Sequence, residues 1–320
     1  MTTPVAGDAR SSPDLVAEVL LQALPYIQRF RGKVVVVKLG GNAMVDETLA
    51  EGFAADVVLM HSVGMLPVVV HGGGPQISDL MERLGKEVTF RDGLRVTDAE
   101  SLDITRMVLV GKVNRDVVAQ LNRHGPLAVG VSGEDAGLIR ASVRDPALGY
   151  VGDVEAVNPA IVERLLSQGL VPVISTTGTD ADGQAYNINA DTVAGALAVA
   201  LGAEKVVFLT DVEGLMRKEG DPDSLVSRVS ASELRLLVDE GVVGSGMIPK
   251  VDSCLSAVEQ GVGSAHMVNG TRPHVLLLEL LTDRGIGTMV TRYTVPAASV
   301  PEEMDAAVEQ TAVEGMEDTP

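Results

Sequence analysis

Aromatic residues are nearly missing from this 320-residue chain, which has no tryptophan, four tyrosines and four phenylalanines. Proteins that bind single-stranded nucleic acid stack bases on aromatic side chains, so the shortage argues against that class. The core must instead be aliphatic, and hydrophobic residues do make up 46% of the chain. Wholesale disorder is thereby excluded, because so much apolar surface can offset the conformational entropy lost on folding.

Cysteine is equally scarce. Cys254 is the only one, which excludes an intrachain disulfide and a multi-cysteine metal site. The five histidines show no spacing typical of metal ligands, and the sequence contains no readable Ser-His-Asp or Cys-His arrangement. We therefore expect no metal held by protein ligands alone, and nucleophilic hydrolysis is disfavoured.

Positive charge is the next deficit, with 25 Lys+Arg against 44 Asp+Glu and a formal net charge of −19. Such an acidic chain is not expected to bind nucleic acid or anionic membranes through its net charge. Residues 294–320 hold seven of the acidic side chains, three prolines and no Lys or Arg. That composition predicts a disordered acidic tail.

Long apolar runs are also lacking. The longest stretch without a charged side chain, residues 57–78, contains two histidines, Pro67 and a Gly-Gly-Gly-Pro run, so it is not a membrane span. The N-terminus has no early cationic cluster, which argues against a signal peptide. We expect a soluble, cytoplasmic protein with no nucleic-acid or membrane partner.

What the chain does contain is a repeated pattern of strand, glycine turn and helix. Valine-rich strands are predicted at residues 34–37, 66–70, 127–131, 171–175 and 206–209, and helices at 47–62, 76–84, 99–122, 158–168, 190–201 and 248–260. Nearly continuous apolar strands that alternate with amphipathic helices predict an α/β fold. We expect a three-layer sandwich around a mainly parallel sheet.

The domain organisation follows from the same pattern. Residues 1–32 combine a flexible N-terminus with an amphipathic helix that either packs on its own domain or docks on another subunit. A soft division near residue 180 separates an N-terminal lobe, 33–180, from a C-terminal lobe, 181–293. Ligands would then lie across the carboxyl ends of the strands.

Two glycine-rich turns follow successive predicted strands. Gly40 and Gly41 end the first strand, and Gly73 and Gly74 follow the second just before a proline. Glycine lets the backbone approach a ligand and present N–H groups, and a helix N-terminus favours an anion. Neither turn has the spacing of a Walker A loop or of a dinucleotide-binding fingerprint. Two such turns together favour an anion site.

Lysine is rare, with seven in the chain, and two of these lie in glycine-rich contexts. Lys38 closes the first valine run, and Lys250 follows Gly246 at a predicted helix start. An ammonium group beside a glycine loop suits phosphoryl oxygens, although a lone lysine at a strand end more often extends to solvent.

Polar residues elsewhere are open to two interpretations. Arg95 could hold a substrate carboxylate or pair with Asp92 or Asp98 at the surface. Asn187 could bind substrate, while Asp191 could pair with lysines or, like Asn189, cap a helix. The turn that contains Thr210, Asp211 and Gly214 could surround a nucleotide or be a plain turn. On spacing alone, the structural alternatives are at least as common.

Taken together, the glycine loops, two lysines, an arginine and an acidic residue form a set without an obvious nucleophile. Phosphoryl transfer needs mainly positioning and charge neutralisation. A carboxylate acceptor is already ionised at neutral pH and needs no general base. The residues by themselves therefore indicate phosphoryl transfer to a small anionic metabolite.

Six segments, in order across about residues 33–292, resemble the acetylglutamate kinases of the amino acid kinase family. They are Val-Lys38-Leu-Gly-Gly-Asn-Ala, Val-His71-Gly-Gly-Gly-Pro, Asp92-Gly-Leu-Arg95-Val-Thr, Tyr186-Asn187-Ile-Asn189-Ala-Asp191, Leu209-Thr-Asp-Val-Glu-Gly214 and Gly246-Met-Ile-Pro-Lys250. The resemblance implies transfer of the ATP γ-phosphate to the side-chain carboxylate of N-acetyl-L-glutamate, in arginine biosynthesis.

The resemblance also implies a role for each matching residue. Lys38 and Lys250 would stabilise the transferring phosphoryl group, with Asp191 orienting both. N-acetylglutamate would be held by Gly73, Gly74, Arg95 and Asn187. Backbone donors would come from Gly40, Gly41 and Gly73. Thr210, Asp211, Gly214 and Gly246 would surround ATP, with Mg²⁺ on its phosphates.

Family members inhibited by arginine carry an additional N-terminal helix that links dimers into a hexameric ring. By that resemblance, L-arginine would inhibit this chain, and the chain would be a dimer or a trimer of dimers. The effector site would lie near Tyr26, Lys218, His266, Glu279 and Gly285.

Two alternatives remain open at this point. One is another activity of the amino acid kinase family, acting on carbamate, aspartate, glutamate or uridylate. The other is a non-catalytic arginine-sensing subunit, like the kinase-like domain of acetylglutamate synthases. The retained Lys38 and Lys250 favour an active enzyme, and the short tail leaves no room for an acetyltransferase domain.

Overall fold

The computed structural model describes residues 13–40, 44, 46–91, 93–218, 220–244, 247–282 and 285–293. Five of the sequence predictions lie outside these residues: the flexible residues 1–11, the loop positions Gly41 and Gly246, the proposed Arg95 partner Asp92, and the acidic tail 294–320. They remain predictions.

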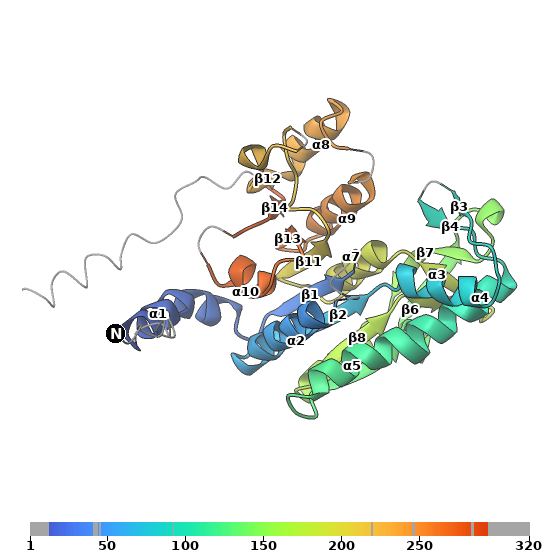
Figure 1. The fold of residues 1–320 in the computed structure, drawn as a ribbon, viewed down its shortest axis with the longest axis horizontal. Coiled ribbons are helices and arrows are strands. Elements are labelled where there is room, and N and C mark those ends of the chain that lie inside the picture. The colour runs from blue at the N-terminus through green and yellow to red at the C-terminus, as the bar shows by residue number, and fades with distance from the viewer. Residues whose placement is uncertain are drawn as a thin grey trace, which may run out of the picture.

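An eight-stranded sheet forms the middle of the molecule, in the order β12-β14-β13-β11-β1-β2-β8-β5 (Figure 1). Its strands are β1 (Val34–Leu39), β2 (Leu66–His71), β5 (Ala128–Ser132), β8 (Val171–Ser175), β11 (Lys205–Thr210), β12 (Arg228–Ser230), β13 (Ser264–Asn269) and β14 (Thr288–Thr291). The strands from β13 through β5 all pair in parallel, and β14 joins β13 antiparallel. The mainly parallel sheet is therefore confirmed.

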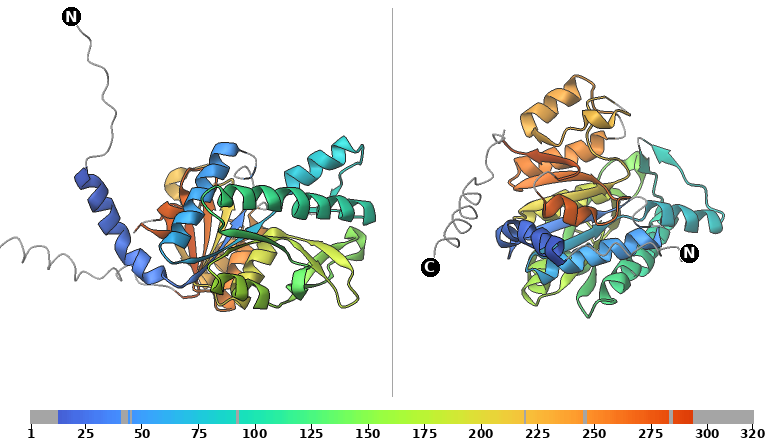
Figure 2. Two further views of the ribbon diagram at one scale, coloured as in Figure 1. Left: turned by 90° about the horizontal axis from the view of Figure 1, so that it is seen from below. Right: turned by 60° about the vertical axis from the view of Figure 1, so that its left-hand side comes forward.

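Helices cover both faces of this sheet. They are α1 (Pro13–Phe30), α2 (Glu47–Ser62), α3 (Gly74–Arg83), α4 (Ala99–Arg106), α5 (Asn114–Asn122), α6 (Ala160–Ser167), α7 (Ala190–Ala200), α8 (Ala231–Asp239), α9 (Ile248–Glu259) and α10 (Val275–Leu280). Side chains of α2, α5 and α10 share one core with one sheet face, and those of α6, α7, α8 and α9 share another with the opposite face (Figure 2). This arrangement confirms the three-layer sandwich.

The two cores follow from alternation along the valine strands. Val36 of β1 packs into the core with α7, whereas its neighbours Val35 and Val37 pack into the core with α2. Successive side chains of a strand point to opposite faces. A run of valines therefore serves both cores at once, which is why the strand shows no polar alternation.

The helix predicted at 99–122 is continuous but not uniform. Between α4 and α5 the segment Met107–Val113 is a π-helix. A π-helix adds a residue to a turn and shifts the faces presented before and after it. Nothing in the apolar spacing predicted this segment, which lies against the glycine loop after β2.

Several short strands were not predicted. A closed four-stranded unit contains β6 (Ile139–Val143), β7 (Val151–Val157), β9 (Thr177–Thr179) and β10 (Ala185–Ile188), and β3 (Phe90–Arg91) pairs with β4 (Leu94–Arg95). Short 3₁₀ turns lie at Asp135–Gly137, Pro146–Leu148 and Pro222–Ser224. These strands are brief and partly exposed, so they lack the valine runs that revealed five strands of the central sheet. Strands β12, β13 and β14 of that sheet and helices α8 and α10 were not predicted either.

Helix α1 begins at Pro13 and extends away from the sheet (Figure 1). Of its residues only Phe30 is buried, while Leu15, Val19, Leu20 and Leu21 are exposed. Its role in oligomerisation and the division near residue 180 stay predictions. No helix in the described part of the chain has the length and hydropathy required to cross a bilayer.

Candidate active site

The central strands β1, β2 and β11 end at the same edge of the sheet, because they are parallel and in register. Lys38 of β1 lies opposite Val70 of β2 and Phe208 of β11. A Cβ atom built on Gly72, just after β2, would lie 3.6 Å from the Cβ of Ala190 in α7. The first two glycine loops and the start of α7 therefore meet at one place.

Lys38 and Asp191 form an ion pair at this edge. Lys38 Nζ lies 3.0 Å from Asp191 Oδ1, and the two side chains are only 12% and 8% exposed. Asp191 Oδ1 nevertheless accepts no well-directed hydrogen bond from the described residues, so the contact is an ion pair with acceptor capacity left over. Of the two interpretations of Asp191, the structure therefore supports pairing with lysine.

Capping of α7 falls to the neighbouring residue. Asn189 Oδ1 accepts hydrogen bonds from the backbone N–H groups of Asp191 and Thr192. The N-cap is thus satisfied by the amide, which leaves the carboxylate of Asp191 for Lys38.

Gly40 allows Lys38 to reach its partner. A Cβ atom on Gly40 would overlap Lys38 Nζ and lie 2.9 Å from Lys38 Cε. The lysine side chain therefore folds back along its own strand end, over a residue with no side chain. The sequence suggested a lysine extending to solvent as the common case, and that interpretation is wrong here.

Lys250 is half-buried in the first turn of α9. Helix α9 packs on α7, and Cys254, one turn after Lys250, lies close enough to Asp191 to feel its charge. Burial first, and the negative charge of Asp191 second, raise the pKa of the Cys254 thiol. The turn of α9 that follows Lys250 therefore lies near Asp191, and the role of Lys250 itself stays a prediction.

The loop after β2 is seated on the π-helix. Gly73 is the N-cap of α3, and a Cβ atom there would lie 2.7 Å from Leu109 Cδ2 and 3.3 Å from Val113 Cγ2. Only glycine lets this loop lie so close to the helix. A Cβ on Gly74 would meet no described atom within 4 Å, so the first turn of α3 is open on that side and its N–H groups suit an anion.

His71 and Asn114 support this loop and were not singled out from the sequence. His71 Nδ1 lies 2.9 Å from the carbonyl oxygen of Gly72, and His71 Nε2 lies 3.0 Å from Asn114 Nδ2. Asn114 also donates to the carbonyl of Val173, at 2.9 Å. A lone buried histidine gives no sequence signal that separates this role from simple core packing.

Arg95 is buried, at 7% exposed, and lies against the start of α3. It donates to the carbonyl of Gly74 at 3.0 Å and to Ser78 Oγ at 2.9 Å, and its guanidinium lies over the ring of Phe90. Burial lowers the pKa of Arg95. A guanidinium fixed in this way keeps further N–H groups for a carboxylate.

The suggested surface partner of Arg95 is engaged elsewhere. Asp98 caps α4 by accepting from the backbone of Ser101, and it accepts from Lys86 Nζ at 2.9 Å. These hydrogen bonds lower the pKa of Asp98 to about 2. The pairing of Arg95 with Asp98 is therefore wrong.

Asn187 lies half-buried on β10, where its backbone pairs with Val151 and Thr177. It stands two residues before the α7 cap Asn189, so the same short segment carries Asn187, the cap and Asp191. The closed four-stranded unit thus delivers Asn187 toward the start of α7.

The turn after β11 is more structural than the sequence suggested. Thr210 is buried, and its hydroxyl lies 2.9 Å from the carbonyl of Val212. Gly214 has φ of 147°, and a Cβ atom there would lie 2.7 Å from Thr288 Oγ1. Packing against β14 therefore explains this glycine, while Asp211 is exposed on the turn.

Three of the predicted effector residues meet at another buried cluster. His266 Nδ1 lies 2.6 Å from Glu279 Oε1, while Glu279 Oε2 accepts from the backbone N–H of Ile286 and Gly287. A Cβ atom on Gly285 would lie 2.8 Å from Glu279 Oε2. We call this set, together with Lys205 and Ser264, the His266 cluster.

Lys205 was missed by the sequence analysis. Its Nζ lies 2.8 Å from His266 Nε2 and 3.3 Å from Ser264 Oγ, and it lies 5.1 Å from the ring centre of Phe30 in α1. Burial lowers the pKa of Lys205 to about 8. Burial and the charge of Lys205 lower the pKa of His266 to about 4, so the imidazole is neutral at pH 7.

The other two predicted effector residues, Tyr26 and Lys218, lie outside this cluster. Tyr26 lies one turn before Phe30 on α1 and is half-buried against the core that contains Phe30. Lys218 is exposed, 3.8 Å from Asp221. The described contacts bring Tyr26 toward the His266 cluster and do not bring Lys218 there.

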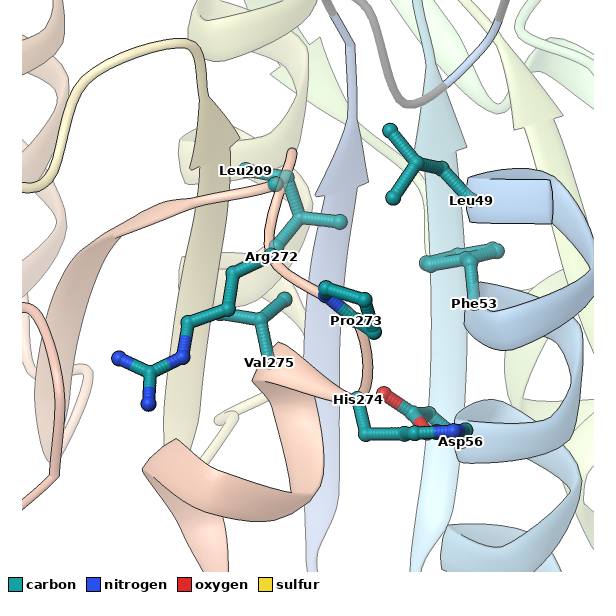
Figure 3. Close-up of a pocket in the computed structure, with 9 residues that line it drawn as sticks. Leu49, Phe53, Asp56, Leu209, Arg272, Pro273, His274 and Val275 are labelled. Atoms are coloured by element: carbon teal, nitrogen blue, oxygen red, sulfur yellow. The ribbon is translucent and has the colours of Figure 1, made fainter. Parts of the chain in front are cut away.

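Two hollows lie near these residues. The pocket of Figure 3 holds about 10 Å³, between α2 and the start of α10, where Asp56 accepts from His274 at 2.7 Å. That volume suits one water molecule and no metabolite. A cavity of about 340 Å³ adjoins the glycine loops, with Leu39 and Gln76 in its wall, and its size is that of a small-molecule site.

Known proteins resemble this chain closely in sequence. It is 50% identical over 292 residues to an acetylglutamate kinase of Pelotomaculum thermopropionicum, covering 88% of this chain and 99% of that one. It is 53% identical over 284 residues to an acetylglutamate kinase of a Synechococcus species, covering 88% and 96%.

Solved structures agree on the architecture. An N-acetylglutamate synthase of Neisseria gonorrhoeae, in complex with coenzyme A and N-acetyl-glutamate, superposes with a TM-score of 0.77 and 27% identity, over 95% of this chain and 71% of that one. A carbamate kinase of Giardia lamblia gives 0.64 and 18%, over 82% and 99%, a likeness of fold alone. A model of the amino acid kinase family matches residues 33–269. The chain therefore belongs to the amino acid kinase family.

Proposed function

We propose that this chain transfers the γ-phosphate of ATP to the side-chain carboxylate of N-acetyl-L-glutamate, giving N-acetyl-L-glutamyl 5-phosphate. The relatives named acetylglutamate kinase, about half identical over most of the chain, support it. The observation that carries the chemistry is the buried Lys38–Asp191 pair beside two glycine loops. Arginine biosynthesis would be the setting of this reaction.

The reaction needs charge neutralisation more than it needs a base. An acceptor carboxylate is ionised at neutral pH. One of its oxygens bonds to the γ-phosphorus as the bond to the β,γ-bridging oxygen breaks, and ADP leaves with that oxygen. Lys38 and Lys250 would stabilise the negative charge on the transferring group. Asp191 keeps Lys38 in place, 3.0 Å away.

Substrate binding would use the groups around α3. The backbone N–H groups of Gly73 and Gly74, the guanidinium of Arg95 and the amide of Asn187 suit an acetylated dicarboxylate. Gly40 and Gly41 would donate to phosphate. ATP would lie by Thr210, Asp211, Gly214 and Gly246, at the carboxyl end of β11.

Magnesium would arrive with the nucleotide. In the described residues no three acidic, histidine or cysteine side chains are grouped as a metal site, and the carboxylate at the site, Asp191, pairs with Lys38. Mg²⁺ usually binds substrate phosphates and water through few protein ligands, so these residues fit an ion carried by ATP. It would supply further charge neutralisation on the phosphates.

Regulation by arginine would act through the His266 cluster. The buried carboxylate of Glu279 suits a guanidinium, and Tyr26 and Phe30 place α1 beside the cluster. The exposed leucines of α1 support association of copies of this chain, as a dimer or a trimer of dimers. The reaction would take place in the cytoplasm, in keeping with the biosynthetic relatives. Lys218 would have to move to join this site.

A coupled assay of ADP release tests the function. We expect turnover with N-acetyl-L-glutamate, and none with carbamate, aspartate, glutamate or uridylate. Addition of L-arginine should lower the rate, and His266→Asn should keep the basal rate while losing that response. Turnover with one of the other acceptors in place of N-acetyl-L-glutamate would overturn the function; an unchanged rate in saturating arginine would overturn the regulation only.

A further inference from the structure

The hydrogen-bond partners of His71 determine which of its two ring nitrogens carries a proton. A backbone carbonyl only accepts, so the 2.9 Å contact with Gly72 O requires a proton on Nδ1. The carboxamide nitrogen of Asn114 only donates, so Nε2, 3.0 Å away, must carry a lone pair. The direction of Asn114 is fixed in turn, since its nitrogen also donates to Val173 O and its oxygen accepts from Arg115. Only the neutral Nδ1–H imidazole satisfies every partner.

The charged groups around His71 agree with this assignment. Burial is the main cause that lowers the pKa of His71, to about 4. The hydrogen bond to Gly72 raises this pKa, and the positive charge of Arg115 lowers it further. Across the sheet its register neighbours are Leu39 on β1 and Ser175 on β8, neither of them charged. The nearest described charges on β1 and α7 are Lys38 and Asp191, which pair with each other.

Both supports of the glycine loop come from one helical junction. Leu109 and Val113 of the π-helix set how close Gly73 lies, and Asn114, the next residue, holds His71 and through it Gly72. The extra residue of a π-helix changes which side chains face the loop on either side of it. Packing therefore fixes the position of Gly73, and the hydrogen bonds from Asn114 to His71 and from His71 to Gly72 fix the position of Gly72.

We propose that His71, oriented by Asn114, is a positioning residue that fixes residues 72–74 for acetylglutamate binding. The proposal rests on the proposed function, since it assumes that the N–H groups of this loop bind that substrate. His71 itself touches no reacting atom. Its effect should therefore appear in KM more than in kcat.

Asn114→Asp is the sharpest test, because it changes the partner of His71 without changing its size. The introduced carboxylate accepts where the amide donated. An adjacent carboxylate raises the pKa of His71 in this variant. At a pH below that pKa, the imidazolium donates one hydrogen bond to Gly72 O and one to the introduced carboxylate, so the loop stays in place. Above that pKa a lone pair of the ring faces either the carboxylate or Gly72 O, and the loop loses a support.

Asn122→Asp is the matched control. Asn122 lies at the other end of α5, donates to the carbonyl of Ala128 at 3.1 Å, and bonds to no histidine among the described residues. Each variant removes the hydrogen-bond donor of one strand carbonyl, that of Val173 in Asn114→Asp and that of Ala128 in Asn122→Asp. A change in KM that results from this loss alone should therefore be common to both variants. The difference between them isolates the effect on His71.

We expect the KM of Asn114→Asp for N-acetyl-L-glutamate to rise by roughly tenfold from pH 6 to pH 8, equivalent to about 1.4 kcal/mol. Wild type and Asn122→Asp should show a common, flatter profile, with kcat changing little in all three. Parallel profiles for the three proteins would overturn the proposal.

Nitrogen-15 NMR of His71 tests the proposal without catalysis, and so covers a variant that folds poorly. The wild-type ring should show a protonated Nδ1 and an unprotonated Nε2 at pH 7, and remain neutral down to pH 5. A protonated Nε2 would contradict the assignment. Absence of wild-type turnover with N-acetyl-L-glutamate would count against the function, whereas an active wild type with parallel profiles would count against His71 alone.

Discussion

Two largely buried lysines on neighbouring strands each lie near a carboxylate, one in direct contact with it and the other separated from it by a histidine. Lys38 of β1 contacts Asp191 directly, at 3.0 Å. Lys205, on the adjacent strand β11 and opposite Val35, reaches Glu279 only through the imidazole of His266. The direct contact forms an ion pair at the candidate active site. The interposed, neutral ring leaves Lys205 with a pKa of about 8, so its charge is open to change near neutral pH.

The carboxylates differ as well. Asp191 Oδ1 accepts no well-directed hydrogen bond within the described part of the chain, whereas both oxygens of Glu279 are occupied by His266 and two backbone N–H groups. Burial pushes the pKa of Glu279 upward, but these hydrogen bonds lower it overall. Under the proposed function the first carboxylate would orient a lysine for a substrate, whereas the second is held by its own surroundings.

The largest expected effect is on turnover. Lys38→Ala should lower kcat by roughly 10³-fold, because one charge-stabilising donor in a site of this kind is worth that much. The KM for N-acetyl-L-glutamate should change little. Steady-state kinetics measure both, with Lys33→Ala, an exposed lysine just before the same strand, as the control. Wild-type kcat in Lys38→Ala would refute the catalytic half of the comparison.

The next effect is on stability. Glu279→Ala should lower the free energy of unfolding by about 3 kcal/mol, because it leaves three N–H groups without their acceptor and removes a negative charge near the buried Lys205. Urea denaturation measures this change. Glu259→Ala removes an exposed carboxylate that pairs with Arg235 and should hardly alter stability. Equal losses in the two variants would show that the His266 cluster stabilises the fold no more than an exposed ion pair does.

The smallest effect is a pH dependence. The pKa of Lys205 is lower in the folded chain, about 8, than its ordinary value of 10.5. Between these values the unfolded chain binds the proton more, so wild-type stability should gain from this lysine as pH rises, by up to about 1.4 kcal/mol per pH unit. Lys205→Met should lack that contribution. Urea midpoints at pH 7.5, 8.5 and 9.5 compare the two, and parallel curves would contradict the lowered pKa.

Five strands of the central sheet were predictable because their valine-rich runs are a strong signal, whereas β12, β13 and β14 were not predicted. Helix α2 runs from Glu47 to Ser62 and β8 from residue 171 to 175, as the apolar pattern indicates. The closed four-stranded unit was not predicted, since β6 and β7 expose much of their length and carry little alternation. Regular burial produces a regular apolar pattern in the sequence, and partial burial produces a weak one.

The candidate site was predictable only in part. Glycine loops and strand-end lysines follow from local chemistry, but the partner of each does not. From the sequence, Asp191 and Asn189 are equally good candidates for the N-cap of α7. Because α7 approaches β1 in the fold, Asn189 caps the helix while Asp191 pairs with Lys38. Lys205, His71 and Asn114 carry no local signal, because their partners come from distant segments.

Strand β11 connects the His266 cluster with the turn where ATP would lie under the proposed function. Lys205 of the His266 cluster begins it and Thr210 ends it, with β1 paired along one edge and β13 along the other. Six residues of strand span about 17 Å from end to end. Because β11 is hydrogen-bonded to a neighbour on each side, the backbone that joins the His266 cluster to Thr210 belongs to the centre of the sheet.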